Sequence, residues 1–242
     1  MRLLLVHARA MTLELLRYPA YLVPTLVFPA AFFLLFVTPR GHGDQTVAMA
    51  TFAGFAAIGV AFFQFGVGIA IERASPWEAY LRTLPVGTGT RLGARVVSAA
   101  VFAAAASAAL AGVAVATTPI ALAPVGWGEL ALTLLAGTTP FALLGIALGY
   151  WAPQRGALPI ANLLYLGLSY AGGLWIRPQD LPAVVAAVSP YLPTGSFSDV
   201  LAGTAAGHPF EPGDCARLAG FAALFAALAA WGYRRDEGRQ FR

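Results

Sequence analysis

The sequence predicts an all-α integral membrane protein, and three observations lead to this prediction. Of the 242 residues, 59% are apolar and only 11% are charged, whereas soluble domains carry roughly 25% charged residues. Long uncharged runs reach the length of about 20 apolar residues that a helix needs to cross the hydrocarbon. Segments of alternating polarity, the signature of a membrane barrel, are not visible, and backbone amides in lipid must be satisfied within the segment. Helices are therefore expected throughout.

Six apolar runs are long enough to cross the membrane as helices. They lie at residues 20–38, 47–71, 96–116, 130–152, 157–176 and 216–233. The run at 216–233 is the shortest and only just reaches the required length. We therefore expect residues 1–242 to form a single transmembrane domain with six spans.

The arginines predict the orientation of these spans. All 15 cationic residues are arginine. If the N-terminus is cytoplasmic, 12 of them fall on inner segments and 3, Arg40, Arg177 and Arg217, on outer segments. Because cytoplasmic segments carry an excess of basic residues, both termini are expected inside the cell. The segment that follows residue 71 is then the first cytoplasmic loop.

Residues 1–18 predict an amphipathic interfacial helix that precedes the first span. On a helical wheel its apolar face consists of Leu4, Ala8, Met11 and Leu15. The opposite arc carries Arg2, Arg9, Glu14 and Arg17. Such a helix is expected to lie in the headgroup plane of membrane lipid before Pro19 turns the chain into the membrane.

The outer segment at residues 177–214 is long for a connection and yet apolar. Prolines at positions 178, 182, 190 and 193 exclude one continuous helix. Two short helices, Pro182–Val188 and Ser196–Ala205, are expected to enter the membrane partly as re-entrant helices and to pack against the bundle. The alternative is a surface loop with an apolar underside.

Polar side chains inside the spans are few. The six runs contain no Asp, Glu, Arg, Lys or His at depth, which disfavours a secondary transporter driven by protons or ions. The candidate pathway or interhelical polar residues are Gln64, Thr138, Thr139 and Asn162. For each of them, an interhelical hydrogen bond is a simpler role than a substrate contact.

Other function classes find little support in the residues. The sequence has no catalytic constellation near a common membrane face, so an enzyme is not expected, and its single cysteine and three scattered histidines predict no metal site. The arginines do not form a stripe with interleaved aromatic residues, which argues against nucleic-acid binding. No lysine is present for a P-loop, so direct ATP use is not expected either.

The stretch "ERASPWEAYLRTLPVGTGTR", residues 72–91, places charges directly after an uncharged run. Ser75 can cap a helix, Pro76 suits its first position, and Glu78 follows as in a capping box. We therefore predict a short helix over residues 75–85 that ends at Pro85. Such a short helix is marginal alone and must be held by a protein or a membrane surface.

This stretch resembles the coupling helix of the permease subunits of ABC-2-type exporters. The amphipathic N-terminal helix, the six spans with both ends inside, and the "SPYLPTGSFSDVLAG" segment before the last span are similar to that family too. The resemblance implies that the helix docks on an ATPase subunit. It assigns ATPase coupling to Glu72, Arg73, Trp77, Glu78, Leu81, Arg82 and Pro85. A helix that only anchors in anionic headgroups is the alternative from the residues themselves.

The resemblance also implies a function and partners. It implies the membrane-spanning subunit of an ATP-driven exporter in a bacterial or archaeal plasma membrane, which works with an ABC ATPase subunit and a second permease copy or paralogue. This chain would hold no cofactor, since ATP and magnesium would bind to the ATPase. The uncharged spans favour a lipophilic or amphipathic small-molecule or lipid substrate. A membrane scaffold without a transport cycle is the alternative from another class.

Overall fold

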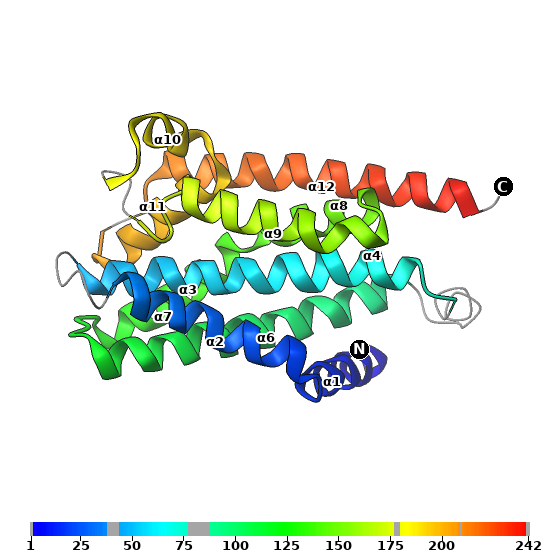
Figure 1. Cartoon of the computed structure of the whole chain (residues 1–242), viewed down its shortest axis with the longest axis horizontal. Helices are drawn as coiled ribbons and strands as arrows, with labels where there is room; N and C mark the ends of the chain where they lie inside the picture. Colours follow the sequence, from blue (N-terminus) through cyan, green and yellow to red (C-terminus); the bar gives the residue numbers. More distant parts are fainter. Residues whose placement is uncertain (1, 38–43, 77–87, 177–179, 209, 241–242) are drawn as a thin grey trace.

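The computed structural model describes residues 2–37, 44–76, 88–176, 180–208 and 210–240, and within these ranges the regular elements are all helical (Figure 1). The helices are α1 (Arg2–Leu16), α2 (Pro19–Phe36), α3 (Gln45–Ala61), the π-helix η1 (Phe62–Val67), α4 (Gly68–Arg73), α6 (Thr88–Thr117), α7 (Pro124–Gly137), α8 (Thr139–Trp151), α9 (Gln154–Ala171), α10 (Ala183–Val188), the 3-10 turn η3 (Ser189–Tyr191), α11 (Pro193–Ala205) and α12 (Pro212–Gln240). The prediction of an all-helical chain is confirmed for this part of the chain.

Five helices are long and apolar enough to cross a membrane. They cover Pro19–Phe36, Gln45–Arg73, Gly89–Thr117, Pro124–Trp151 and Pro212–Glu237. Each of them contains one of the predicted spans, apart from small shifts at the ends. The remaining predicted span, 157–176, corresponds to α9, which begins earlier, at Gln154. Because α9 includes Gln154, Arg155 and Asn162, its hydropathy is lower than that of the other five.

Three spans extend further than the sequence pattern indicates. The fourth predicted span begins at residue 130, whereas α7 begins at Pro124. The other two extend into several charged residues. The third predicted span begins at residue 96, whereas α6 begins at Thr88 and includes Arg91 and Arg95. The last span is predicted over 216–233, whereas α12 continues to Gln240 through "RRDEGR". In both cases the helix continues past the apolar run into charged residues. Charged side chains end an apolar run without ending a helix, because arginine and glutamate are good helix formers.

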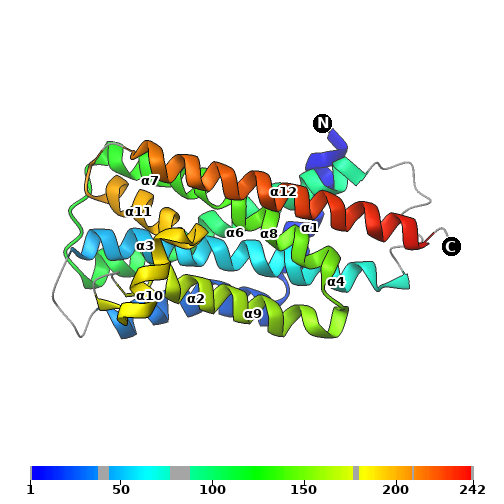
Figure 2. The same ribbon diagram turned by 90° about the horizontal axis from the view of Figure 1, so that it is seen from above.

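The helix that runs from α3 through η1 into α4 forms the centre of the bundle (Figures 1 and 2). Of its most apolar window, 78% is buried, against 17–33% for the other four membrane-capable helices. Every residue from Met49 to Ala61 is buried. This helix therefore contacts protein around its whole circumference, and the other helices surround it.

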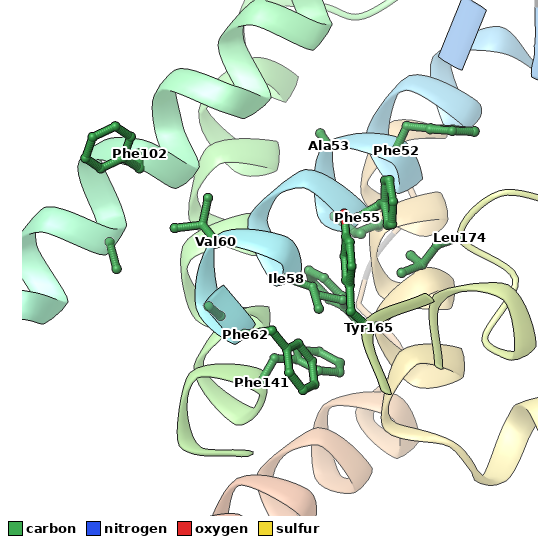
Figure 3. Close-up of a cluster of buried hydrophobic side chains, with 14 of the residues drawn as sticks. Phe52, Ala53, Phe55, Ile58, Val60, Phe62, Phe102, Phe141, Tyr165 and Leu174 are labelled. Atoms are coloured by element: carbon green, nitrogen blue, oxygen red, sulfur yellow. The ribbon is translucent and has the colours of Figure 1, made fainter. Parts of the chain in front are cut away.

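Aromatic side chains from several helices surround this central helix (Figure 3). Phe55 stacks on Tyr165 of α9, with ring centroids 4.5 Å apart and planes 3° apart. Phe52 and Phe62 are also fully buried, together with Phe102 of α6 and Phe141 of α8. Interactions between such ring pairs add specificity to apolar packing, because the rings have preferred mutual orientations.

Glycines allow α8 to approach the central helix closely. A Cβ atom on Gly145 would lie 2.8 Å from the carbonyl oxygen of Ala61, and one on Gly149 would lie 2.8 Å from that of Phe65. The GxxxG spacing of these two residues thus marks the contact between α8 and η1. Small residues at this spacing let helix backbones meet, and dispersion contacts then hold them together.

The two ends of the bundle carry different parts of the chain. Helix α1, the end of α4, the start of α6 and the C-terminal end of α12 lie at one end, and α10 and α11 at the other (Figures 1 and 2). The chain between α9 and α12 contains helices at nearly the predicted places, Ala183–Val188 and Pro193–Ala205. Most of α11 is buried, including Phe197 and Leu201. Helix α11 therefore packs into the bundle, whereas α10 has no buried residue.

The glycine contact of α8 can be tested by adding one methyl group. We expect Gly145→Ala to lower the free energy of unfolding by about 1–3 kcal/mol, because the new Cβ atom meets backbone that cannot move alone. Gly112→Ala is the control, since a Cβ atom there has no neighbour within 4 Å. Thermal unfolding in detergent measures both. Equal midpoints for the two variants would contradict the close contact between α8 and η1.

Candidate functional site

Four charged residues at the end of α4 form two ion pairs, and we call them the α4-end cluster: Glu72, Arg73, Arg95 and Asp236. The carboxylate of Glu72 pairs with the guanidinium of Arg95 on α6. The guanidinium of Arg73 pairs with the carboxylate of Asp236 on α12. Two consecutive residues thus connect the end of the central helix to two other long helices. Both residues immediately precede the segment in which the sequence predicts the coupling helix.

Arg95 is the buried member of the cluster, with a side chain only 9% exposed. Besides Glu72, it contacts the central helix itself, because its Nη1 donates to the carbonyl oxygen of Gln64 at 2.6 Å. That carbonyl is available because of the π-helix. The N–H of Gly68, which in an α-helix would donate to Gln64, donates instead to Phe63 and Phe65. A buried guanidinium needs such partners, since an unpaired charge is very costly inside a protein.

Gly68 makes room for this arginine. A Cβ atom on Gly68 would lie 2.6 Å from the Nη1 atom of Arg95, closer than nonbonded atoms normally approach. The site therefore combines a glycine, a π-helix and a carboxylate around one guanidinium. All of these features come from the stretch between Phe62 and Glu72, so this part of the central helix accommodates Arg95.

Arg73 contacts α8 as well as α12. Its Nη2 donates to the carbonyl oxygen of Ala152 at 3.3 Å, and its guanidinium lies 5.6 Å from the ring centroid of Tyr150. The side chains of Arg73 and Asp236 are 20% and 13% exposed. This pair is therefore largely shielded from water, which makes the loss of either partner more costly than in an exposed pair.

Gln64 provides a second polar contact between helices. Its Nε2 donates to the hydroxyl oxygen of Tyr21 on α2 at 2.9 Å. The side chain is 5% exposed, and its Oε1 atom has no hydrogen-bond partner among the described residues. Gln64 thus makes a hydrogen bond between the central helix and α2.

The other three polar candidates lie elsewhere and do not form a site with Gln64. Thr138 and Thr139 lie at the junction of α7 and α8, and their hydroxyls donate to carbonyls one turn earlier, Leu134 and Leu135. Asn162 is partly buried on α9. The two hydroxyls thus bond backbone of the turn that precedes them in the chain.

Five of the predicted coupling residues, Trp77, Glu78, Leu81, Arg82 and Pro85, lie outside the described residues. Of the predicted coupling set, the structure describes Glu72 and Arg73. At the start of the stretch, the N–H of Ser75 donates to the carbonyl of Glu72 at 2.9 Å. The docking role of the stretch stays a prediction.

Sequence reasoning missed two members of the α4-end cluster. The sequence pattern places Arg95 in the inner loop, because its charge directly precedes the apolar run that begins at residue 96. Its distance of four residues from Arg91 was the available signal, since that spacing is helical. Asp236 lies 163 residues from Arg73, and no local pattern indicates such a partner.

The N-terminal helix has a protein partner on its apolar face. Ala8 is 3% exposed, and Leu4 lies against Gly93 of α6, where a Cβ atom would be 2.9 Å from its Cδ1. The remaining arc exposes five large apolar residues: Leu3, Leu5, Val6, Leu13 and Leu16. The face that the sequence indicates for lipid is therefore occupied by α6, and a mixed face of apolar residues and arginines remains outside.

Metal chemistry has no evident site in the part of the chain that the structure describes. Within it, no group of three or more His, Cys, Asp or Glu residues could hold a metal ion. The charges of the α4-end cluster are paired with one another. What this arrangement can do chemically is hold helices together through charge, and its partners are the protein's own elements.

The five membrane-capable helices, of which the buried central helix is one, define a multi-pass helical membrane protein. The chain is 23% identical over 190 residues to the Bacillus subtilis (strain 168) protein described as "Putative transport permease YvfS", a match that covers 76% of this chain and 78% of that protein. No family model and no solved structure matches the chain. The resemblance to a transport permease that the sequence indicates is thereby confirmed.

The contact between Tyr21 and Gln64 can be tested by removing one hydroxyl group. We expect Tyr21→Phe to lower the free energy of unfolding by about 1–2 kcal/mol, because the Gln64 amide loses its acceptor. Tyr18→Phe is the control, since Tyr18 is 59% exposed. The measurement is denaturation in detergent micelles. Adding Gln64→Leu to Tyr21→Phe should recover part of the lost stability. Equal stabilities of Tyr21→Phe and Tyr18→Phe would contradict the contact.

Proposed function

We propose that this chain is the membrane-spanning permease subunit of an ATP-driven exporter of the ABC-2 type. A separate ABC ATPase subunit binds ATP and magnesium and drives the transport. A second permease copy or a paralogue completes the membrane part. The complex hydrolyses ATP through its partner, and this chain contributes the path through the membrane.

The main support is the match to a protein named as a transport permease over 76% of this chain. The arrangement of the bundle supports the ATPase partner. The stretch with the predicted coupling helix follows α4 and precedes α6 in the chain, and the end of α4 and the start of α6 lie at the same end of the bundle as α1 and the end of α12 (Figure 1). An ATPase on the cytoplasmic side would meet this end, if both termini are cytoplasmic as the arginines indicate.

The proposed topology has six spans, with α9 as the fifth. Helix α9 packs on the central helix through Tyr165, so it belongs to the bundle despite its lower hydropathy. Helices α10 and α11 then form the outer re-entrant part. The exposed face of α1, with Arg2, Arg9 and Arg17 among apolar side chains, suits contact with lipid headgroups.

The proposed substrate is a lipophilic or amphipathic compound, drug-like or lipid-like. The long helices present apolar surfaces, and Arg95, the buried cation of the described spans, is already paired with Glu72. A strongly charged solute would need a buried countercharge on its path. An apolar compound needs none, and it can enter from the hydrocarbon itself.

Capture of the chain from its own membrane tests the proposal. We expect the tagged full chain, purified in mild detergent, to retain an ATPase subunit whose ATP hydrolysis vanadate inhibits. The charge exchange Glu78→Arg with Arg82→Glu should remove this subunit, because it preserves the pairing within the predicted helix and inverts the pattern that a partner meets.

The matched control is the exchange Glu14→Arg with Arg17→Glu on α1, where both side chains are exposed. It makes the same change of charges on a helix that the structure describes. If the Glu78/Arg82 exchange retained the ATPase as the control does, docking through these residues would be wrong. A chain that never retains an ATPase would favour the scaffold instead.

A further inference from the structure

The end of α4 is connected to its surroundings by side chains that diverge. Glu72 reaches Arg95 on α6, and Arg73 reaches Asp236 on α12. Neighbouring residues of a helix point about 100° apart, so the two pairs lie on different sides of α4. The end of the central helix is therefore held between two long helices.

Each pair extends to a further element. Arg95 also bonds the Gln64 carbonyl in η1, and Arg73 also bonds the Ala152 carbonyl at the end of α8. A displacement of the α4 end would therefore act on η1, α6, α8 and α12 together. Three of the four side chains are no more than 20% exposed. Because shielded charges cannot exchange their partner for water cheaply, opening the Arg73–Asp236 pair would be costly.

We infer that Glu72 and Arg73 are connectors, which pass movement of the segment after α4 to α6 and α12, and that they are not contacts for the ATPase. This inference rests on the proposed function, because it assigns the movement to ATPase docking on that segment. Glu72 and Arg73 are positioning residues in this scheme. Their partners Arg95 and Asp236 belong to the same machinery, although they are distant in the sequence.

The Arg73–Asp236 pair is the better one to test by exchange. An exchange of Glu72 and Arg95 would place a carboxylate against the Gln64 carbonyl, and two acceptors would then repel each other. An exchange of Arg73 and Asp236 reverses the pair. It gives up the contact with the Ala152 carbonyl, which is the longer of the hydrogen bonds described above. Arg73→Asp, Asp236→Arg and the double variant therefore form a usable set.

Cys215 supplies a natural reporter, because it is exposed, is the only cysteine and lies in the first turn of α12, at the end far from Asp236. The experiment uses the complex with its ATPase in proteoliposomes. It compares the rate at which a maleimide labels Cys215 without nucleotide and after trapping with ATP and vanadate. Retention of the ATPase on the purified chain is measured in parallel for every variant.

We expect the wild-type complex to show a nucleotide-dependent difference in labelling rate. Arg73→Asp should lose this difference while the ATPase stays bound and hydrolyses ATP, and the double variant should regain it. The control is Arg234→Asp, an identical change at an exposed position two residues from Asp236. It should keep the difference. A merely structural role would instead show as a loss of folding or of the retained ATPase in Arg73→Asp, because the exchange restores a stabilising ion pair as well as a connecting one.

Three results would overturn the inference and leave the proposed function in place. The first is an unchanged nucleotide response in Arg73→Asp. The second is loss of the ATPase from Arg73→Asp but not from Arg234→Asp, which would make Arg73 a docking residue. The third is a wild-type complex that contains the ATPase and shows no response at Cys215. Absence of any ATPase from the wild-type chain would instead reject the proposed function, and the connectors with it.

If Arg73→Asp does not fold, Asp236→Asn replaces it. This variant removes one charge with little change in shape, and size-exclusion chromatography checks its folding. It should show the same loss of the nucleotide response with the ATPase retained. A normal response in a folded Asp236→Asn complex would overturn the inference.

Discussion

The rest of the structure depends on one constraint, which is that the central helix is buried around its whole circumference. A backbone polar group that loses its bond within a membrane helix cannot be satisfied by lipid, so a neighbouring part of the protein must supply its hydrogen-bond partner. Glycines at 145 and 149 admit the backbone of α8, and Tyr165 stacks on Phe55. Helices α8 and α9 are thus fitted to the central helix, and their places follow from that fit.

The π-helix shows how this constraint acts on polar groups. A π-helix shifts the hydrogen-bond ladder by one residue and leaves a carbonyl group without its usual partner. In this bundle the carbonyl of Gln64 is met by Arg95, and Gly68 provides the space. The side chain of Glu72 is 47% exposed, whereas that of Arg95 is 9% exposed. The arginine is therefore held from inside by the backbone, while its carboxylate partner keeps contact with the exterior.

The sequence indicates the elements of this fold much better than their contacts. Apolar runs predict helices because lipid and a dry core make the same demand, and five of the predicted spans coincide with membrane-capable helices. The π-helix leaves no trace in "FFQFGV", since every residue there is apolar, glycine or glutamine. The predicted third span begins only at residue 96 because Arg95 is charged, although Arg95 lies within α6. The deciding information was the partner of Arg95, which only the packed chain provides.

The same holds for the candidate site. Glu72 and Arg73 stand out in the sequence because they follow an uncharged run. The same position places them at the end of the central helix, where they form ion pairs with α6 and α12. Their partners are 23 and 163 residues away. Among 26 glycines, the sequence alone cannot select Gly68, because its importance depends on the neighbouring guanidinium and not on its own conformation.

The order of the two charges adds a geometric condition. A single ion pair at the end of a helix restrains its distance from one neighbour but still permits rotation about the helix axis. Two pairs from consecutive residues diverge by about 100°, so rotation that relaxes one pair strains the other. The end of α4 is thereby fixed in rotation as well as in position. A helix end that is restrained in both ways is suited to move together with α6 and α12, as the connector role that we infer requires.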